Sequence, residues 1–194
     1  FESVKSYEGI HMFLNPLLPL INDPDVIFKF IEAAARIGQV QDVERVCRES
    51  KAYNPEKVRD FLKEIKLSSP LPLIIVCDTY GYIADMVKYL SKNSMRQAIE
   101  GYVTQMSPGN TPVVVGTLLD VDDGSGADDF VKNILNLVGS RCPIEPLVKE
   151  VESRNKLRLI QSWLEARANE GNQETALHNA LLKIYIDTRN DPER

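Results

Sequence analysis

Residues 113 to 129 hold the most chemically suggestive cluster of the chain and read VVVGTLLDVDDGSGADD. An apolar run ends at Asp120, which is followed by Asp122 and Asp123 and then by a Gly-Ser-Gly turn. Closely spaced carboxylates of this kind can form an aspartyl-phosphate, bind a divalent cation, or lie in the solvated turn after a helix.

The catalytic interpretation is a phosphatase of the haloacid-dehalogenase type. Asp120 would be the nucleophile, Asp122 the general acid/base, and Mg²⁺ would neutralise the phosphate. That chemistry needs both aspartates at the end of a central strand, with a lysine and further acids supplied by later strands. After Asp129 the pattern is helical to the end of the chain, so the required context is missing.

A calcium loop also fails on spacing. An EF-hand loop needs acids at positions 1, 3 and 5, glycine at position 6 and glutamate at position 12. A loop that starts at Asp120 places Gly124 at position 5, Ser125 at position 6 and Val131 at position 12. The cluster therefore predicts no metal site.

The remaining interpretation is a helix that ends near Asp120, followed by a surface turn. Gly124 and Gly126 would permit positive φ in this turn, and Asp123 or Asp128 would cap the next helix. The sequence thus favours a junction loop, with no catalytic residue, no cofactor and no metal.

Other reactive side chains are isolated. His11 and His178 have no Cys or His at ligand spacing, and His178 is expected on the apolar side of its helix as a structural residue. Trp163 is expected in the core, and the small residues Ala33 and Ala34 are expected where two helices approach closely. The cysteines lack a CxxC pair and are expected to be buried thiols of a reducing compartment: Cys47, Cys77 and Cys142.

Composition excludes several classes of protein. The 194 residues carry a net charge of −5, which argues against sequence-independent nucleic-acid binding, and 43% are hydrophobic, as in ordinary globular proteins. No apolar run is long enough to cross a bilayer, and no signal peptide is evident. The first residue is Phe1, so we expect a piece of a longer polypeptide.

Helical periodicity recurs along almost the whole chain. Residues 54–67 have Asn54 as a cap, Pro55 in the first turn and an apolar stripe, and residues 23–38 repeat this pattern with Asp23, Pro24 and a closing Gly38. The expected stripes are Val58/Phe61/Leu62/Ile65, Ile83/Met86/Val87/Leu90, Met95/Ile99/Tyr102/Met106, Phe130/Ile134/Leu137, Ile144/Leu147/Val148/Val151 and Leu177/Leu181/Ile184/Tyr185.

Two apolar runs could instead be buried strands: LPLIIVCD at 71–78 and TPVVVGTLLD at 111–120. Each begins next to a proline, Pro72 or Pro112, at a place that suits a helix start. Short helices surround both runs, without the crossover units that a parallel sheet needs. We therefore expect buried helices.

The helix-opening prolines are spaced regularly. Pro24 to Pro55 and Pro112 to Pro143 are each about 30 residues apart, enough for two short helices and two turns. The expected fold is all-α, an α-solenoid of short stacked helical hairpins.

Longer stretches of the sequence resemble the clathrin heavy chain family. They are DPDVIFKFIEAAARIGQVQDVERVCRES, YNPEKVRDFLKEIKLSSPLPLIIVCD, TLLDVD and EVESRNKLRLIQSWLEARANEG…ALHNALLKIYIDTRNDPER. The likeness runs from Phe1 to Arg194 and departs from the family in SKNSMRQAIEGY and in DDGSGADD, where the connection is longer. It implies an α-zigzag in the distal leg, with residues 1–121 the C-terminal part of one heavy-chain repeat and 122–194 the N-terminal part of the next.

The resemblance also implies a function. The segment would be a structural, non-enzymatic part of the coat of vesicles and coated pits, in endocytosis and intracellular protein transport, on the cytoplasmic face. Its partners would be other heavy-chain legs, with the light chain and the adaptors contacting regions outside this segment, and with no nucleic acid and no membrane insertion. The alternatives are a heavy-chain-repeat solenoid of a vacuolar tethering complex, or the phosphatase at Asp120 and Asp122.

One charged surface is a candidate for contacts between neighbouring legs. Its basic residues alternate with acids, which usually indicates only a solvated face. They are Arg36, Arg45, Arg48, Lys51, Lys57 and Arg59.

Overall fold

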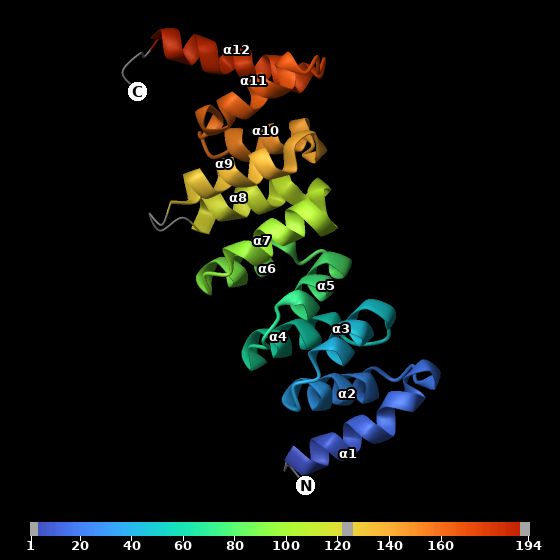
Figure 1. Cartoon of the computed structure of the whole chain (residues 1–194). Helices are drawn as coiled ribbons and strands as arrows, with labels where there is room; N and C mark the ends of the chain where they lie inside the picture. Colours follow the sequence, from blue (N-terminus) through green and yellow to red (C-terminus); the bar gives the residue numbers. More distant parts are fainter. Residues whose placement is uncertain (1–3, 122–125, 191–194) are drawn as a thin grey trace. The chain divides into compact units, whose positions relative to one another are not determined.

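The computed structural model describes residues 4–121 and 126–190, and every regular element in these two ranges is helical (Figure 1). By compactness the chain divides into two units, residues 1–82 and 83–194. The first unit contains α1 (Val4–Leu14), η1 (Asn15–Leu20), α2 (Pro24–Arg36), α3 (Val40–Glu49), α4 (Pro55–Ile65) and α5 (Leu71–Tyr80). The second contains α6 (Ile83–Lys92), α7 (Arg96–Gly101), η2 (Tyr102–Met106), η3 (Pro108–Asn110), α8 (Thr111–Val121), α9 (Ala127–Val138), η4 (Gly139–Arg141), α10 (Ile144–Glu152), η5 (Leu157–Ile160), α11 (Gln161–Asn169) and α12 (Thr175–Asn190).

Helices in the first unit pack on their neighbours in sequence and on the next helix but one. Helix α1 packs on α2, α2 contacts both α3 and α4, and α5 lies against α3 and α4. The core includes Ile27, Phe30 and Ile31 of α2, all at most 1% exposed. This pattern of contacts is that of stacked helical hairpins.

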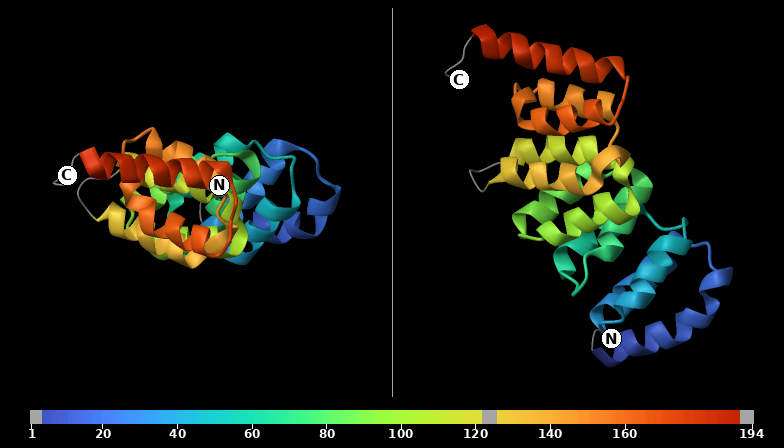
Figure 2. Two further views of the ribbon diagram at one scale, coloured as in Figure 1. Left: turned by 90° about the horizontal axis from the view of Figure 1, so that it is seen from above. Right: turned by 45° about the horizontal axis from the view of Figure 1, so that its top comes forward.

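The second unit has two layers. Helices α6, α8, α10 and α12 contact one another in succession, while α9 contacts η2 and α11 on the other side (Figure 1). In the views of Figure 2, α8 and α9 lie side by side, and α12 follows α10 and α11. The all-α solenoid expected from the sequence is confirmed.

Caps and prolines set the helix starts as expected. The Asp23 carboxylate accepts the backbone N–H groups of Asp25 and Val26 at 2.9 and 3.1 Å, and Pro24 begins α2. The Asn54 side chain likewise accepts the N–H of Lys57 at 3.0 Å. These bonds satisfy amides that have no partner within the helix, which fixes the first turn.

The two apolar runs are helices, as predicted, because each lies between other helices. Run 71–78 lies in α5, which packs on α3 and α4, and run 111–120 lies in α8, which packs on α6, α9 and α10. A helix enclosed on several sides is apolar around most of its circumference. The buried Thr117 hydroxyl donates to the Val113 carbonyl at 2.8 Å, so its polar group is satisfied.

Three of the expected apolar stripes end in a residue that is exposed and not buried, so these three residues were predicted wrongly. In α9 the buried arc contains the predicted Phe130 and Ile134 together with Val131, Leu135 and Val138, and Leu137 lies beside this arc with 48% exposed. In α12 Tyr185 falls beside the arc in the same way and is 44% exposed.

Met106 is the third. The chain leaves regular α-helix after Gly101 and continues as the π-helical turn η2, which breaks the 3.6-residue period. Met106 at its end is 36% exposed.

Candidate functional site

Asp120, the proposed nucleophile of the phosphatase interpretation, lies in the last turn of α8. It therefore lies within a helix and not at the end of the strand that this chemistry needs. Its supposed acid/base partner Asp122, together with Asp123 and Gly124, lies outside the described residues.

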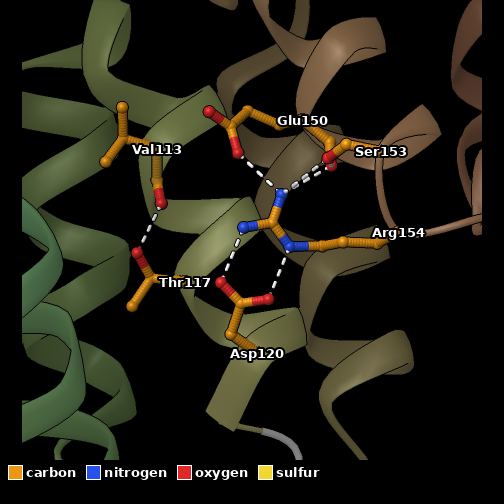
Figure 3. Close-up of polar contacts among 6 residues, drawn as sticks. All are labelled: Val113, Thr117, Asp120, Glu150, Ser153 and Arg154. Atoms are coloured by element: carbon orange, nitrogen blue, oxygen red, sulfur yellow. Dashed lines mark hydrogen bonds and ion pairs between the residues drawn. The ribbon is translucent and has the colours of Figure 1, made fainter.

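Asp120 is bound by Arg154, which lies two residues after the end of α10 (Figure 3). Arg154 Nε donates to Asp120 Oδ1 at 2.7 Å, and Nη2 donates to Oδ2 at 2.6 Å. This is the bidentate arrangement in which a guanidinium binds a carboxylate most strongly.

The third nitrogen of the guanidinium turns back to α10. Arg154 Nη1 donates to the Glu150 backbone carbonyl at 2.6 Å and to Glu150 Oε2 at 2.7 Å, and lies 3.2 Å from Ser153 Oγ. One guanidinium thus joins two carboxylates, one from each helix. Its side chain is 23% exposed, against 52% for Asp120.

These contacts lower the reactivity of Asp120. The hydrogen bonds from Arg154 hold the pKa of the Asp120 carboxyl below its usual value, and the same bonds raise the pKa of the guanidinium. An attacking carboxylate needs free lone pairs, and both oxygens of Asp120 accept hydrogen bonds here. The arrangement suits a structural link between α8 and α10.

Helix α9 has a different N-cap residue from the one predicted. Gly126, at φ +82°, precedes the first turn of α9, which confirms its positive φ. Asp128 is not the cap. It lies within the first turn and pairs with Lys156 at 2.8 Å. A negative side chain in the first turn also interacts favourably with the helix dipole.

Within residues 4–121 and 126–190, no group of three or more His, Cys, Asp or Glu side chains is placed to hold a metal ion. No helix in these ranges combines the length and apolar character needed to span a bilayer.

The two histidines differ in environment. His11 Nε2 lies 2.8 Å from Asp42 Oδ2, and its ring stacks on Phe30 with centroids 5.1 Å apart. His178 is exposed on α12, so its predicted place on the apolar side is wrong. The reason is the arc of Leu177, Ala180, Leu181 and Ile184, which leaves the residue after Leu177 about 100° away.

The residues assigned to packing are buried as expected. Trp163 is 5% exposed, and Ala33 and Ala34 are fully buried in α2. All three cysteines are free and buried, which confirms their assignment as buried thiols: Cys47, Cys77 and Cys142.

The basic residues of the first unit are largely engaged within the chain. Arg48 pairs with Glu44 at 2.9 Å along α3. Other contacts are Arg36 with Glu32, Arg45 with Asp42, Lys57 with Asp25, and Arg59 with Asp60. The surface is thus a set of mixed pairs, as its sequence indicated.

An exposed apolar surface was missed by the sequence reasoning. Met12, Phe13 and Leu20, at the end of α1 and in η1, are 76%, 68% and 82% exposed. A separate hollow of about 470 Å³ is lined by residues of η1, α2 and α3 and of the loops after η1 and α3. The sequence signal was the run MFLNPLLPL, in which two prolines interrupt the helical period.

The comparison with protein families identifies the chain. A family model described as "Clathrin: Region in Clathrin and VPS" matches residues 1–124 and 135–194. The chain belongs to the clathrin family.

Individual clathrin heavy chains are similar over the whole chain. The sequence is 52% identical over 193 residues to the clathrin heavy chain of Dictyostelium discoideum and 50% identical over 194 residues to that of Drosophila melanogaster. It is 49% identical over 193 residues to clathrin heavy chain 2 of Homo sapiens. These alignments cover 100% of this chain but only 11%, 11% and 12% of the relatives, so it corresponds to about one ninth of a clathrin heavy chain.

Proposed function

We propose that this chain is a structural segment in the leg of a clathrin heavy chain, part of the polyhedral coat of vesicles and coated pits. The observation that carries the proposal is the identity of about half to clathrin heavy chains over the entire chain. Within each unit, helices that contact mainly their neighbours along the chain suit a segment built from stacked repeats. A vacuolar tethering role has no comparable support, because the relatives cited are clathrin heavy chains.

The segment acts mechanically in this proposal and not as a catalyst. Legs of separate heavy chains lie alongside one another, and many weak contacts sum to a stable but reversible lattice. Support comes from Asp120, whose two oxygens are both engaged by Arg154.

We further propose that a repeat boundary falls at the junction loop, with residues 1–121 in one clathrin heavy-chain repeat and 122–194 in the next. The two stretches matched by the family model, 1–124 and 135–194, are consistent with this boundary. The light chain and cargo adaptors would contact parts of the full-length heavy chain outside this segment. The coat would lie on the cytoplasmic face of coated pits and vesicles.

A chimera tests the function. The segment replaces its counterpart in the full-length Dictyostelium heavy chain, and trimer formation and cage assembly are measured by sedimentation and electron microscopy. We expect cages at a yield close to that of the unmodified chain. A second chimera, with a helical-repeat segment of equal length from an unrelated protein, is the control and should not form cages. Trimers of the first chimera that form no cages would contradict the proposal.

A further inference from the structure

Gly116, in the middle of α8, lies directly beneath the Glu150–Arg154 pair. A Cβ built on this glycine would lie 2.4 Å from Glu150 Oε2 and 3.1 Å from both Nη1 and Nη2 of Arg154. The first distance is shorter than any real contact of a methyl group. The absence of a side chain at this position is therefore what lets the carboxylate and the guanidinium lie against the helix.

Other glycines in helices do not share this environment. A Cβ at Gly9 in α1 or at Gly101 at the end of α7 would have nothing within 4 Å. Glycine is a poor helix former, and α8 is buried on several sides. A helix interior that accepts glycine at this cost needs a reason, and the close approach of the Arg154 cluster supplies one.

The cluster is specific for one register of the two helices. Gly116 and Asp120 are four residues apart and lie on one face of α8, while Glu150 and Arg154 are four residues apart on α10 and its end. A shift of α8 by one residue turns this face by about 100° and presents a residue that carries a side chain. Apolar contacts between α8 and α10 are non-directional and do not enforce one register so strictly.

We propose that Gly116, Asp120, Glu150 and Arg154 form a register lock that fixes α8 against α10. Gly116 has no side chain and leaves space for the Glu150 carboxylate and the Arg154 guanidinium. The guanidinium binds one carboxylate on each helix. An isolated surface ion pair is worth little. This one combines a bidentate fork, a second carboxylate, a backbone carbonyl and a fitted slot in the opposing helix.

The consequence is mechanical and goes beyond the proposed coat function. Helix α8 lies between α6 and α10, and α10 contacts α12, so the lock stands in the middle of the stack of the second unit. With the lock closed, the helices on either side of it keep a fixed separation. With the lock open, α8 and α10 slide or tilt against each other while their apolar faces stay in contact.

Spin labels measure this separation in the 194-residue chain. Cysteines replace Ala84 on α6 and Leu182 on α12, both exposed and both outside the lock. The buried native cysteines are replaced by serine or alanine only if they take up label. We expect a narrow distance distribution for the parent and a shifted or broader one for Gly116→Ala, because the methyl group displaces Glu150 and crowds Arg154.

Further variants separate the lock from simple loss of stability. Arg154→Met should broaden the distribution most, and Arg154→Lys, which keeps the charge but loses the fork, should broaden it almost as much. Gly101→Ala is the matched control and should leave it unchanged. Circular dichroism at the temperature of the measurement confirms that each variant is folded.

Unchanged distances in folded Gly116→Ala and Arg154→Met would overturn the proposal. If Arg154→Met does not fold, the test rests on Gly116→Ala and Arg154→Lys, and unchanged distance distributions in both would overturn the proposal. None of these measurements requires coat assembly, so failure of the lock is distinguishable from failure of the proposed function. In the full-length chimera, the lock variants should widen the distribution of cage diameters relative to the Gly101→Ala control.

Discussion

His11 on α1 and Asp42 on α3 are joined by a contact of 2.8 Å between Nε2 and Oδ2, although 31 residues separate them. Arg45 Nη2 donates to the other oxygen of Asp42 at 3.0 Å and to the side-chain oxygen of Asn15 at 2.7 Å. Burial alone would raise the pKa of Asp42, but the hydrogen bonds from Arg45 and His11 lower it. The ionised carboxylate therefore stabilises the packing of α1 and η1 on α3.

This arrangement predicts a pH-dependent stability. Since the folded-state pKa of Asp42 lies below its ordinary value of 3.8, its contribution is complete above that value and is lost as the pH falls through the folded-state pKa. Asp42→Asn should lower the free energy of unfolding by about 1 kcal/mol at pH 7, and the difference from wild type should shrink below about pH 4. Urea titrations across this range measure it. Asp129→Asn, at a 90% exposed side chain, should have almost no effect. A deficit in Asp42→Asn that shows no decrease between pH 7 and the lowest pH at which both proteins fold would contradict the interpretation.

The corrected face of α9 predicts a contrast between two aliphatic residues. Ile134 is fully buried, so Ile134→Ala should cost about 2–5 kcal/mol. Leu137→Ala, three residues on and 48% exposed, should cost less than about 1 kcal/mol. Leu62→Ala in α4, with 3% exposed, should resemble Ile134→Ala. Equal losses for Ile134→Ala and Leu137→Ala in equilibrium unfolding would show that the face is assigned wrongly.

The engagement of Asp120 predicts that the chain has no phosphatase activity. With p-nitrophenyl phosphate and Mg²⁺, we expect no turnover above the buffer rate, and no difference between wild type and Asp120→Asn. The same substitution should lower stability by up to about 1 kcal/mol, a modest figure because the Asp120 side chain is 52% exposed. Turnover that disappears in Asp120→Asn would restore the enzyme hypothesis.

The cysteines provide a test of burial in the folded chain. Burial raises the pKa of the Cys47 thiol to about 12 and that of Cys142 to about 12, so few thiolates exist at neutral pH. We expect no reaction with Ellman's reagent in the native state and three reactive thiols after unfolding in urea, one for each cysteine of the sequence. Rapid labelling of the native chain at the stoichiometry of one thiol would contradict the burial of that site.

The sequence predicted those features that depend on neighbouring residues. Asp23 and Asn54 cap the helices that follow them because capping is local, and Phe130 and Ile134 are buried as their helical spacing predicted. The lock was not predicted, because 34 residues separate Asp120 from Arg154 and the fold alone brings them together. An exposed His178 was missed for a similar reason: the buried arc of α12 depends on which helix covers it.

Charge reversal should have different effects at Arg45 and at Arg48, which both belong to the candidate surface for contacts between legs. Arg45 is committed to Asp42 and Asn15, so Arg45→Glu places two carboxylates together and should lower the melting temperature by several degrees. Arg48 pairs only along its own helix in the contacts described above and is 58% exposed, so Arg48→Glu should leave the melting temperature within about 1–2 °C of wild type. Thermal unfolding of both variants of the 194-residue chain measures this contrast.

An effect of Arg45→Glu on cage yield would therefore mix folding with lattice contacts, whereas Arg48→Glu in the full-length chimera tests the lattice contact itself. A large loss of stability in Arg48→Glu would show that this residue also belongs to the fold, and would remove it as a probe of contacts between legs.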